Sequence, residues 1–183
     1  INVHYLSEQI IDYVNKKKFD SSITIVKEEE KILDTGGGVL NAIQYFSNRP
    51  FLIINPDTIW NPKHAKELKL LEKSFSSNEK CKCSMLLIDK KKSFDKNFKG
   101  DFNLENNLIS RKTADNLKYI FTGMQIIKPD IFYEFDSKIF SINKIWDKLI
   151  KKEELFGIES NADFLHVSTL EVYKSLLEKK FRH

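Results

Sequence analysis

Three consecutive glycines and one aspartate behind an apolar run are the residues of this sequence whose types and spacing could do chemistry. The glycine triplet 36–38 opens a helical pattern, where backbone N–H groups without side chains around them can face an anion or a flat base. Asp57 comes soon after the apolar run Phe51–Ile54. Its carboxylate is therefore expected at the open end of a buried strand, where a hard cation could take it as an oxygen ligand.

Each of these features also has a purely structural interpretation. The triplet could be a tight loop that brings a helix close to a sheet, because it matches neither a P-loop nor a dinucleotide-binding fingerprint. No Gly-Lys-Ser/Thr follows it, and the whole chain has only six glycines. Asp57 could cap the following helix, which would contribute about 1 kcal/mol. The residues Thr58–Trp60 stand between Asp57 and that helix, which weakens the capping interpretation.

Apolar periodicity predicts alternating strands and helices around these residues. Helices are expected at about 7–18, from the glycine triplet to about 47, and at 62–75, 142–150 and 170–177. Strands are expected at 23–26, 51–54, 84–88, 119–127 and 162–167, with a hairpin that pairs 100–104 with 108–111.

This order of elements predicts a three-layer α/β/α, Rossmann-like domain with a mixed, mostly parallel sheet. In such sheets ligands bind beyond the carboxyl ends of the strands. The glycine triplet, Asp57 and His166 are all expected at strand ends, so the sequence predicts that they share one site.

Composition limits the class of protein. The 183 residues are 41% hydrophobic, enough for a single domain over 1–183, and the net charge is +4. No apolar run reaches the roughly 20 residues that a membrane span needs. Of the 30 basic residues only Arg49, Arg111 and Arg182 are arginines, which argues against nucleic acid as a partner. Cys81 and Cys83 lack a second pair that would complete a zinc site, and they indicate a reducing compartment.

The segment Asp34-Thr35-Gly36-Gly37-Gly38, together with the strand end Asn55-Pro56-Asp57-Thr58-Ile59-Trp60, resembles the sugar-1-phosphate nucleotidyltransferase family. Within that family it is most similar to the N-acetylmuramate-1-phosphate uridylyltransferases and the mannose-1-phosphate guanylyltransferase-like proteins. Further similarity lies at 2–6, 100–102 and 121–124. The segment 164–169 is similar to the closing W-x-D-V-G-T motif of the family.

The resemblance implies transfer of a nucleotidyl group from UTP or GTP to a sugar 1-phosphate in the cytoplasm, in sugar-nucleotide or cell-envelope metabolism. The expected partners are the nucleoside triphosphate and the sugar phosphate, with Mg²⁺, or alternatively Mn²⁺, as the cofactor. Carried over by position, Asp57 is the catalytic and metal-binding residue, and His166 stands where the family has a second metal-binding aspartate. The residues implied in substrate binding are Thr35, Gly36 and Gly37 at the base, and Asn55, Asp101 and Gly123.

Two departures from the family motivate an alternative. The glycine-rich loop that grips the triphosphate does not occur in these 183 residues, so we expect the first strand, this phosphate loop and a helix to precede Ile1, and a chain without them to be weakly active or inactive. The imidazole of His166 is also a softer ligand than carboxylate, whereas magnesium prefers oxygen. The alternative is a catalytically incomplete module that binds a nucleotide-sugar or has a regulatory role. The sequence does not indicate the oligomeric state.

Overall fold

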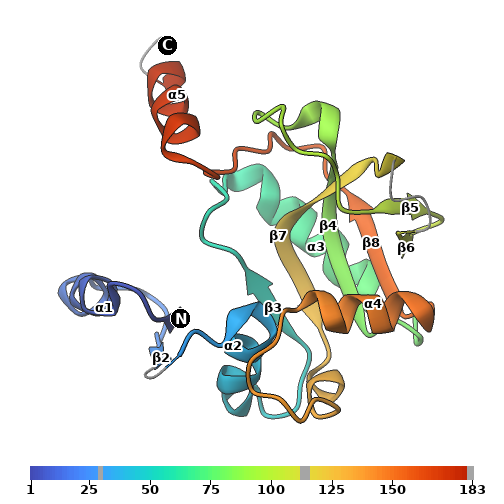
Figure 1. The fold of residues 1–183 in the computed structure, drawn as a ribbon, viewed down its shortest axis with the longest axis horizontal. Helices are drawn as coiled ribbons and strands as arrows, with labels where there is room; N and C mark the ends of the chain where they lie inside the picture. The colour runs from blue at the N-terminus through green and yellow to red at the C-terminus, as the bar shows by residue number, and fades with distance from the viewer. Residues whose placement is uncertain (29–30, 112–115, 181–183) are drawn as a thin grey trace. The chain divides into compact units, whose positions relative to one another are not determined.

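The computed structural model describes residues 1–28, 31–111 and 116–180, and the chain divides into two compact units (Figure 1). Unit 1 comprises Ile1–Arg49 and Pro129–Lys148, and unit 2 comprises Pro50–Lys128 and Leu149–His183. The glycine triplet therefore belongs to unit 1, whereas Asp57 and His166 belong to unit 2.

Unit 1 is built from short elements. A two-stranded parallel pairing joins β1 to β2. The elements are β1 (Asn2–Val3), α1 (Ser7–Lys16), β2 (Val26–Lys27), α2 (Asp34–Ala42), η1 (Ile43–Phe46), η4 (Pro129–Phe132) and the first residues of α4 (Asn143–Lys151). The helix expected at 7–18 is confirmed as α1. The glycine triplet does not precede the second helix but lies inside the first turn of α2.

Unit 2 holds a six-stranded sheet in the order β3-β7-β4-β8-β6-β5. Its elements are β3 (Phe51–Ile54), α3 (Pro62–Ser76), β4 (Cys83–Asp89), η2 (Lys90–Lys92), β5 (Asn103–Glu105), β6 (Leu108–Ser110), β7 (Tyr119–Ile127), β8 (Leu155–Glu159) and α5 (Leu170–Lys180). The strands expected at 51–54 and 119–127 are confirmed to the residue. The hairpin is confirmed as β5 and β6, and Asn106 and Asn107 turn it with positive φ.

The mixed α/β sheet is confirmed, but the expectation that it is mostly parallel is wrong. Among the pairings described within the six-stranded sheet, β4 with β8 is parallel and the four others are antiparallel. The reason is β7, which lies between β3 and β4 and runs opposite to both. Alternation of strands and helices along the chain cannot reveal such an insertion, because β7 arrives from the hairpin and not from a crossover helix.

The strand expected at 162–167 is not a strand. The segment forms two isolated bridges, Ser93 with Phe164 and Thr58 with His166. The strand that lies between α4 and α5 along the chain is instead β8, which the sequence patterns did not predict. Its five residues are interrupted by Gly157 and follow a stretch rich in lysine and glutamate, so its apolar signal is short.

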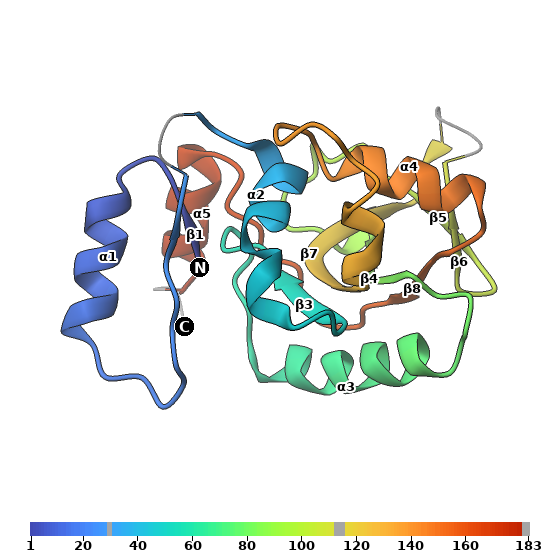
Figure 2. The same ribbon diagram turned by 90° about the horizontal axis from the view of Figure 1, so that it is seen from below.

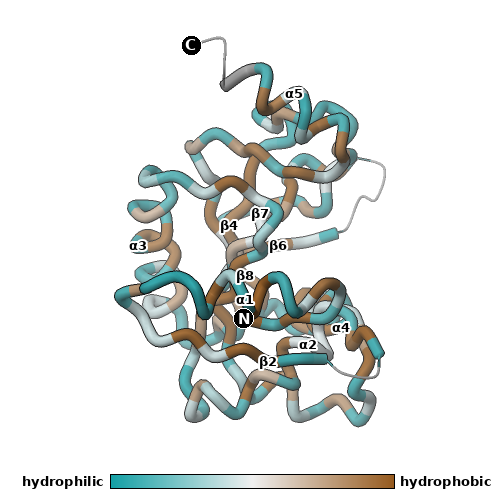
Figure 3. The backbone as a smooth tube through the Cα atoms, turned by 90° about the vertical axis from the view of Figure 1, so that its left-hand side faces the viewer, coloured by the Kyte–Doolittle hydropathy of each residue, from teal (hydrophilic) through white to brown (hydrophobic). Residues whose placement is uncertain are grey.

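Helix α3 covers one face of the sheet in unit 2 (Figure 2). Leu71 and Phe75 from the helix form a buried cluster with Leu86 of β4 and Met124 of β7. Residues of the opposite face, such as Met85 and Leu87, have no exposed surface either, so both faces of β4 are covered. In Figure 3 the hydrophobic colour follows these central strands. Burial on both faces is the arrangement expected of a three-layer α/β domain.

Within the described residues, none of the helices has the length and the apolar character needed to cross a membrane.

Candidate active site

Asp57 lies in a turn that is anchored to the sheet on both sides. After β3 ends, the N–H of Asn55 donates to the carbonyl of Gly123 in β7 at 2.8 Å, and the indole N–H of Trp60 donates to the carbonyl of Asn55 at 3.1 Å. The hydroxyl of Thr58 is buried and donates to the carbonyl of Thr122 at 2.8 Å. With its neighbours held in this way, the side chain of Asp57 remains 46% exposed. The carboxylate thus stands at the end of β3, as predicted.

The helix cap identified as the alternative role of Asp57 belongs to another residue. The side chain of Asn61 accepts a hydrogen bond from the N–H of Lys63, and the ring of His64 accepts one from the N–H of Asn61. This reciprocal capping box starts α3. The capping interpretation of Asp57 is therefore wrong, and its carboxylate is available for another role.

The structure brings His166 to Asp57, although 109 positions separate them in the sequence. The N–H of Ile59 donates to the carbonyl of Leu165, and the N–H of Val167 donates to the carbonyl of Asp57, both at 2.8 Å. These two bonds align the segments antiparallel and place Nε2 of His166 3.1 Å from Oδ2 of Asp57. Such a bond requires a proton on Nε2, which donates to the carboxylate. The other carboxylate oxygen, Oδ1, accepts no hydrogen bond from the described residues.

The ring of His166 is fixed by aromatic neighbours. It stacks on Phe164 with centroids 5.7 Å apart and meets the edge of Phe98 at 5.4 Å. Its Nδ1 atom is buried and has no hydrogen-bond partner among the described residues. The ring therefore presents one nitrogen, Nε2, to Asp57.

Another carboxylate, Asp95, lies near this pair. The backbone N–H of Asn97 is the main cause that lowers the pKa of Asp95, and the charge of His166 makes a smaller contribution in the same direction. The hydroxyl of Ser168 also donates to Asp95, at 3.0 Å. Asp95 is thus an ionised group that is already engaged by nearby donors.

Three of the residues that the family resemblance implied in substrate binding gather along β7. Gly123 has φ of +93°, and a Cβ atom there would lie 2.8 Å from Cβ of Asn55. Asp101 accepts the N–H of Phe121 on its Oδ2 at 2.9 Å and donates its own N–H to the carbonyl of Tyr119 at 2.7 Å. The structure therefore groups Asn55 with Gly123 and ties Asp101 to the same strand.

The glycine triplet lies in unit 1, where close packing against backbone atoms accounts for Gly36 and Gly37, whereas Gly38 faces side chains. The N–H groups of Gly36 and Gly37 both donate to the carbonyl of Phe140, at 2.9 and 3.0 Å. Added Cβ atoms would collide with Phe140 at Gly36, with the carbonyl of Lys138 at Gly37 and with the carboxylate of Glu28 at Gly38. These contacts favour the structural interpretation of the triplet, since two of its amides already have acceptors. A role of Gly36 and Gly37 beside a base stays a prediction.

Thr35 is also engaged inside unit 1. Its hydroxyl accepts the N–H of Ile142 at 3.0 Å, at the start of α4, and donates to Oδ1 of Asp34 at 3.1 Å. The residue thus links the first turn of α2 to the residue that precedes α4. Its predicted contact with a base likewise stays a prediction.

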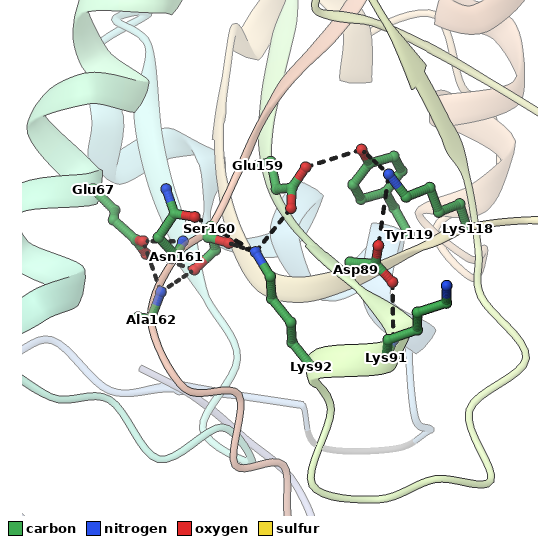
Figure 4. A network of polar contacts seen from close by, with 10 residues as sticks. All are labelled: Glu67, Asp89, Lys91, Lys92, Lys118, Tyr119, Glu159, Ser160, Asn161 and Ala162. Carbon is green, nitrogen blue, oxygen red and sulfur yellow. Dashed lines mark hydrogen bonds and ion pairs between the residues drawn. The ribbon is translucent and has the colours of Figure 1, made fainter.

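A polar corner comes after β8 and leads into the segment that carries His166 (Figure 4). Lys92 donates to Glu159 at 2.9 Å and reaches the carbonyl of Ser160 at 3.4 Å, while Tyr119 donates its hydroxyl to Glu159 at 3.0 Å. The hydrogen bond from Lys92 is the largest cause that lowers the pKa of Glu159. The sequence patterns did not indicate this corner, because its partners come from distant segments.

The lowered pKa of Glu159 predicts a pH-dependent contribution to stability. A carboxyl group whose pKa is lower in the folded state stabilises the fold above its unfolded pKa, and this contribution is lost as the pH falls through the folded value. We therefore expect Glu159→Gln to destabilise the protein more at about pH 6 than at about pH 4, which is below the ordinary pKa of a glutamate. Urea unfolding at the two pH values measures this. In a Lys92→Gln background the difference should shrink, and an equal effect of Glu159→Gln at both pH values would contradict the prediction.

The described residues contain no group of three or more histidine, cysteine, aspartate or glutamate side chains that could hold a metal ion. The donor set at the end of β3 is a single exposed carboxylate with one free oxygen. Magnesium at phosphate-transfer sites is commonly held by one or two carboxylates, with phosphate oxygens and water in the remaining positions. Asp57 fits such a role, whereas His166 is already bonded to it.

The fold is shared with solved structures of nucleotide- and nucleotide-sugar-binding proteins. HddC from Yersinia pseudotuberculosis, complexed with GMP-PN, matches 97% of this chain and 76% of its own length with a TM-score of 0.71 at 20% identity. A UDP-glucose pyrophosphorylase complexed with UDP-glucose matches 99% of this chain and 74% of its own length with a TM-score of 0.64 at 14% identity. The class that these similarities define is therefore the Rossmann-like α/β fold.

The sequence is also similar to a curated protein, the N-acetylmuramate alpha-1-phosphate uridylyltransferase of Caulobacter vibrioides. The two sequences are 23% identical over 172 residues, and the aligned region covers 91% of this chain and 71% of that protein. No family model matches the sequence. The resemblance to sugar-1-phosphate nucleotidyltransferases that the sequence indicated is thus confirmed.

Proposed function

We propose that this protein transfers a nucleoside monophosphate from a nucleoside triphosphate, UTP or GTP, to a sugar 1-phosphate. The observation that carries the proposal is the pairing of Asp57 with His166 at the end of β3 in this fold. The similarity to a uridylyltransferase supports this function over a catalytically incomplete binding module.

The reaction needs no covalent enzyme intermediate. A phosphate oxygen of the sugar 1-phosphate attacks the α-phosphorus of the triphosphate, a new P–O bond forms, and the bond between the α-phosphorus and its bridging oxygen breaks. Pyrophosphate leaves with the bonding electrons. Both reactants are anions, so the catalytic requirement is to position them and to neutralise their charge.

Asp57 and His166 have complementary parts in this proposal. A divalent ion held by Asp57, Mg²⁺ or alternatively Mn²⁺, supplies the charge neutralisation when bound. Oδ1 of Asp57 is the oxygen proposed to bind the ion, whereas Oδ2 accepts the hydrogen bond from Nε2 of His166. This hydrogen bond fixes the orientation of the carboxylate. We therefore assign His166 to orienting the ligand and not to direct ligation. The neighbouring Asn55 and Gly123 stand where the sugar phosphate is proposed to bind.

The cellular setting is part of the same proposal. Nucleoside triphosphates are the donors, which suits a cytoplasmic enzyme of sugar-nucleotide or cell-envelope metabolism. The expectation that a strand, a phosphate-binding loop and a helix precede Ile1 stays a prediction, and the sequence encoded upstream tests it.

The test is product formation by the polypeptide as its gene encodes it. UTP and GTP are each combined with N-acetylmuramate 1-phosphate, mannose 1-phosphate or glucose 1-phosphate in the presence of Mg²⁺. We expect one pair to yield a nucleotide-sugar and an equal amount of pyrophosphate, measured by mass spectrometry and by a coupled pyrophosphate assay. If no pair releases pyrophosphate above the enzyme-free rate, the proposed activity is wrong.

A further inference from the structure

Glu67 is a buried acid that the proposed chemistry does not use. It lies on the face of α3 that packs against the sheet, in line with the buried residues His64, Leu71 and Phe75, and its relative exposure is 8%. An ionised carboxylate in such a place is costly unless several donors satisfy it. The position therefore calls for a specific set of partners.

Those partners all belong to the corner after β8 (Figure 4). Oε1 of Glu67 accepts the backbone N–H groups of Asn161 at 2.7 Å and of Ala162 at 3.1 Å, and Oε2 accepts the hydroxyl of Ser160 at 2.8 Å. The carboxylate thus binds three consecutive residues. A geometry of this kind fixes both the position and the direction in which the chain leaves the sheet.

The other side of the same corner is held by a cation. Lys92 donates to Glu159 and approaches the carbonyl of Ser160 and the side-chain oxygen of Asn161, at 3.4 and 3.5 Å. The carboxylate of Glu67 accepts hydrogen bonds from the N–H groups of the corner, and the ammonium group of Lys92 donates to its oxygen atoms. The two charged side chains therefore bind complementary groups of the corner.

The corner matters for the site because it leads directly to the histidine. Four residues after Ala162 the chain reaches His166, and no regular strand supports it on the way. The intervening support consists of separate contacts, which include the bridge of Phe164 to Ser93, the bond from the N–H of Phe94 to the carbonyl of Phe164 at 3.2 Å and the bond from the N–H of Ile59 to the carbonyl of Leu165. A shift at residues 160–162 would therefore reach His166 through a short segment that is held only at isolated points.

We propose that Glu67 is a positioning residue of the active site, which sets the bond between His166 and Asp57 by fixing the corner at 160–162. This inference rests on the proposed function for its kinetic consequence, but its structural consequence can be measured without activity. Residues that hold a metal-ligating side chain in its orientation typically contribute about 10- to 100-fold to activity or metal affinity.

Two variants of Glu67 separate the effect of side-chain length from the effect of charge. Glu67→Gln keeps the length of the side chain, so its amide oxygen still accepts the N–H groups of Asn161 and Ala162 while its NH₂ group donates to Ser160. Glu67→Asp keeps the charge but is one methylene shorter and cannot bind all three donors. Glu72→Gln is the matched control, because Glu72 is an exposed acid of the same helix.

The first readout is hydrogen exchange at the amides of Ile59 and Val167, whose bonds join the two segments of the site. We expect Glu67→Asp to speed their exchange by about tenfold or more, and Glu67→Gln and Glu72→Gln to change it by less than about threefold. The second readout is kinetic. Glu67→Asp should lower kcat by about 10- to 100-fold with a small change in KM for the nucleotide, and Glu67→Gln should restore most of it.

The outcomes distinguish the two claims. Unchanged exchange at Ile59 and Val167 in a folded Glu67→Asp variant would overturn the positioning role, and so would a Glu67→Gln variant that is as impaired as Glu67→Asp. If Glu67→Asp does not fold, Ser160→Ala removes one of the three donors and should speed exchange at the same two amides. If the unmodified protein forms no product with any substrate pair, the proposed function fails while the exchange measurements still decide the role of Glu67.

Discussion

Replacing Asp57 with asparagine is expected to lower kcat by about 100- to 1,000-fold and to leave the fold intact. The amide has nearly the same shape as the carboxylate but no charge, so it is a poor ligand for a divalent ion. The backbone of residue 57, which accepts the N–H of Val167, is not altered. Steady-state kinetics at saturating Mg²⁺ measure the loss, and thermal unfolding checks the fold.

The control for this prediction is Asp163→Asn. Asp163 lies three positions before His166, its side chain is 76% exposed, and its ion pair with Lys63 spans 3.9 Å at the surface. The Asp163→Asn variant should retain full turnover, because an exposed ion pair of this kind contributes little to stability. Equal turnover in the Asp57→Asn variant and the unmodified protein would remove Asp57 from the site.

Replacing Gly123 with alanine is expected to lower the free energy of unfolding by about 2–4 kcal/mol. Two costs combine at this position. The φ of +93° strains any residue with a Cβ atom, and that atom would lie 2.8 Å from Cβ of Asn55, which is tied to the sheet by its own N–H. Urea unfolding measures the loss.

Gly157→Ala separates crowding from backbone strain. Its φ lies outside the left-handed region, and an added Cβ would lie 2.9 Å from the terminal methyl group of Ile109 and 3.0 Å from the carbonyl oxygen of Met85. Because the crowding remains but the positive φ is absent, we expect a smaller loss than at Gly123. If the Gly123→Ala variant unfolds at the same denaturant concentration as the unmodified protein, the strain assigned to Gly123 is wrong.

The sequence predicted the parts of this fold whose signal is local. Strand β3 is a run of four apolar residues, β7 is a longer uncharged run, and the hairpin turn at Asn106 and Asn107 is marked by residues that tolerate positive φ. By contrast, β8 is short and contains Gly157, and the run at 162–167 is apolar because Phe164 is buried and not because it forms a ladder. Burial and strand pairing produce the same pattern in so short a segment.

The sequence indicated which types of residue the site contains, but not which residues they contact. Asp57 lies at the end of β3 as expected, whereas His166 lies beside it on a segment that is not a strand, so the strand-end rule accounts for Asp57 alone. Which chain segment covers the glycine triplet could not be known, since Phe140 is about 100 residues away. Glu67 did leave a signal, as an acid within the buried stripe of α3, and a charged residue in such a stripe indicates a specific partner.

The arrangement around His166 has a consequence for how such a site could change over evolutionary time. The histidine reaches Asp57 on a connecting segment that belongs to no ladder, and the backbone bonds on either side of it do not depend on its side chain. Residue 166 can therefore be exchanged without disturbing the hydrogen bonds of the sheet. Such a position lets the side chain next to Asp57 change in a single step, while the scaffold stays the same.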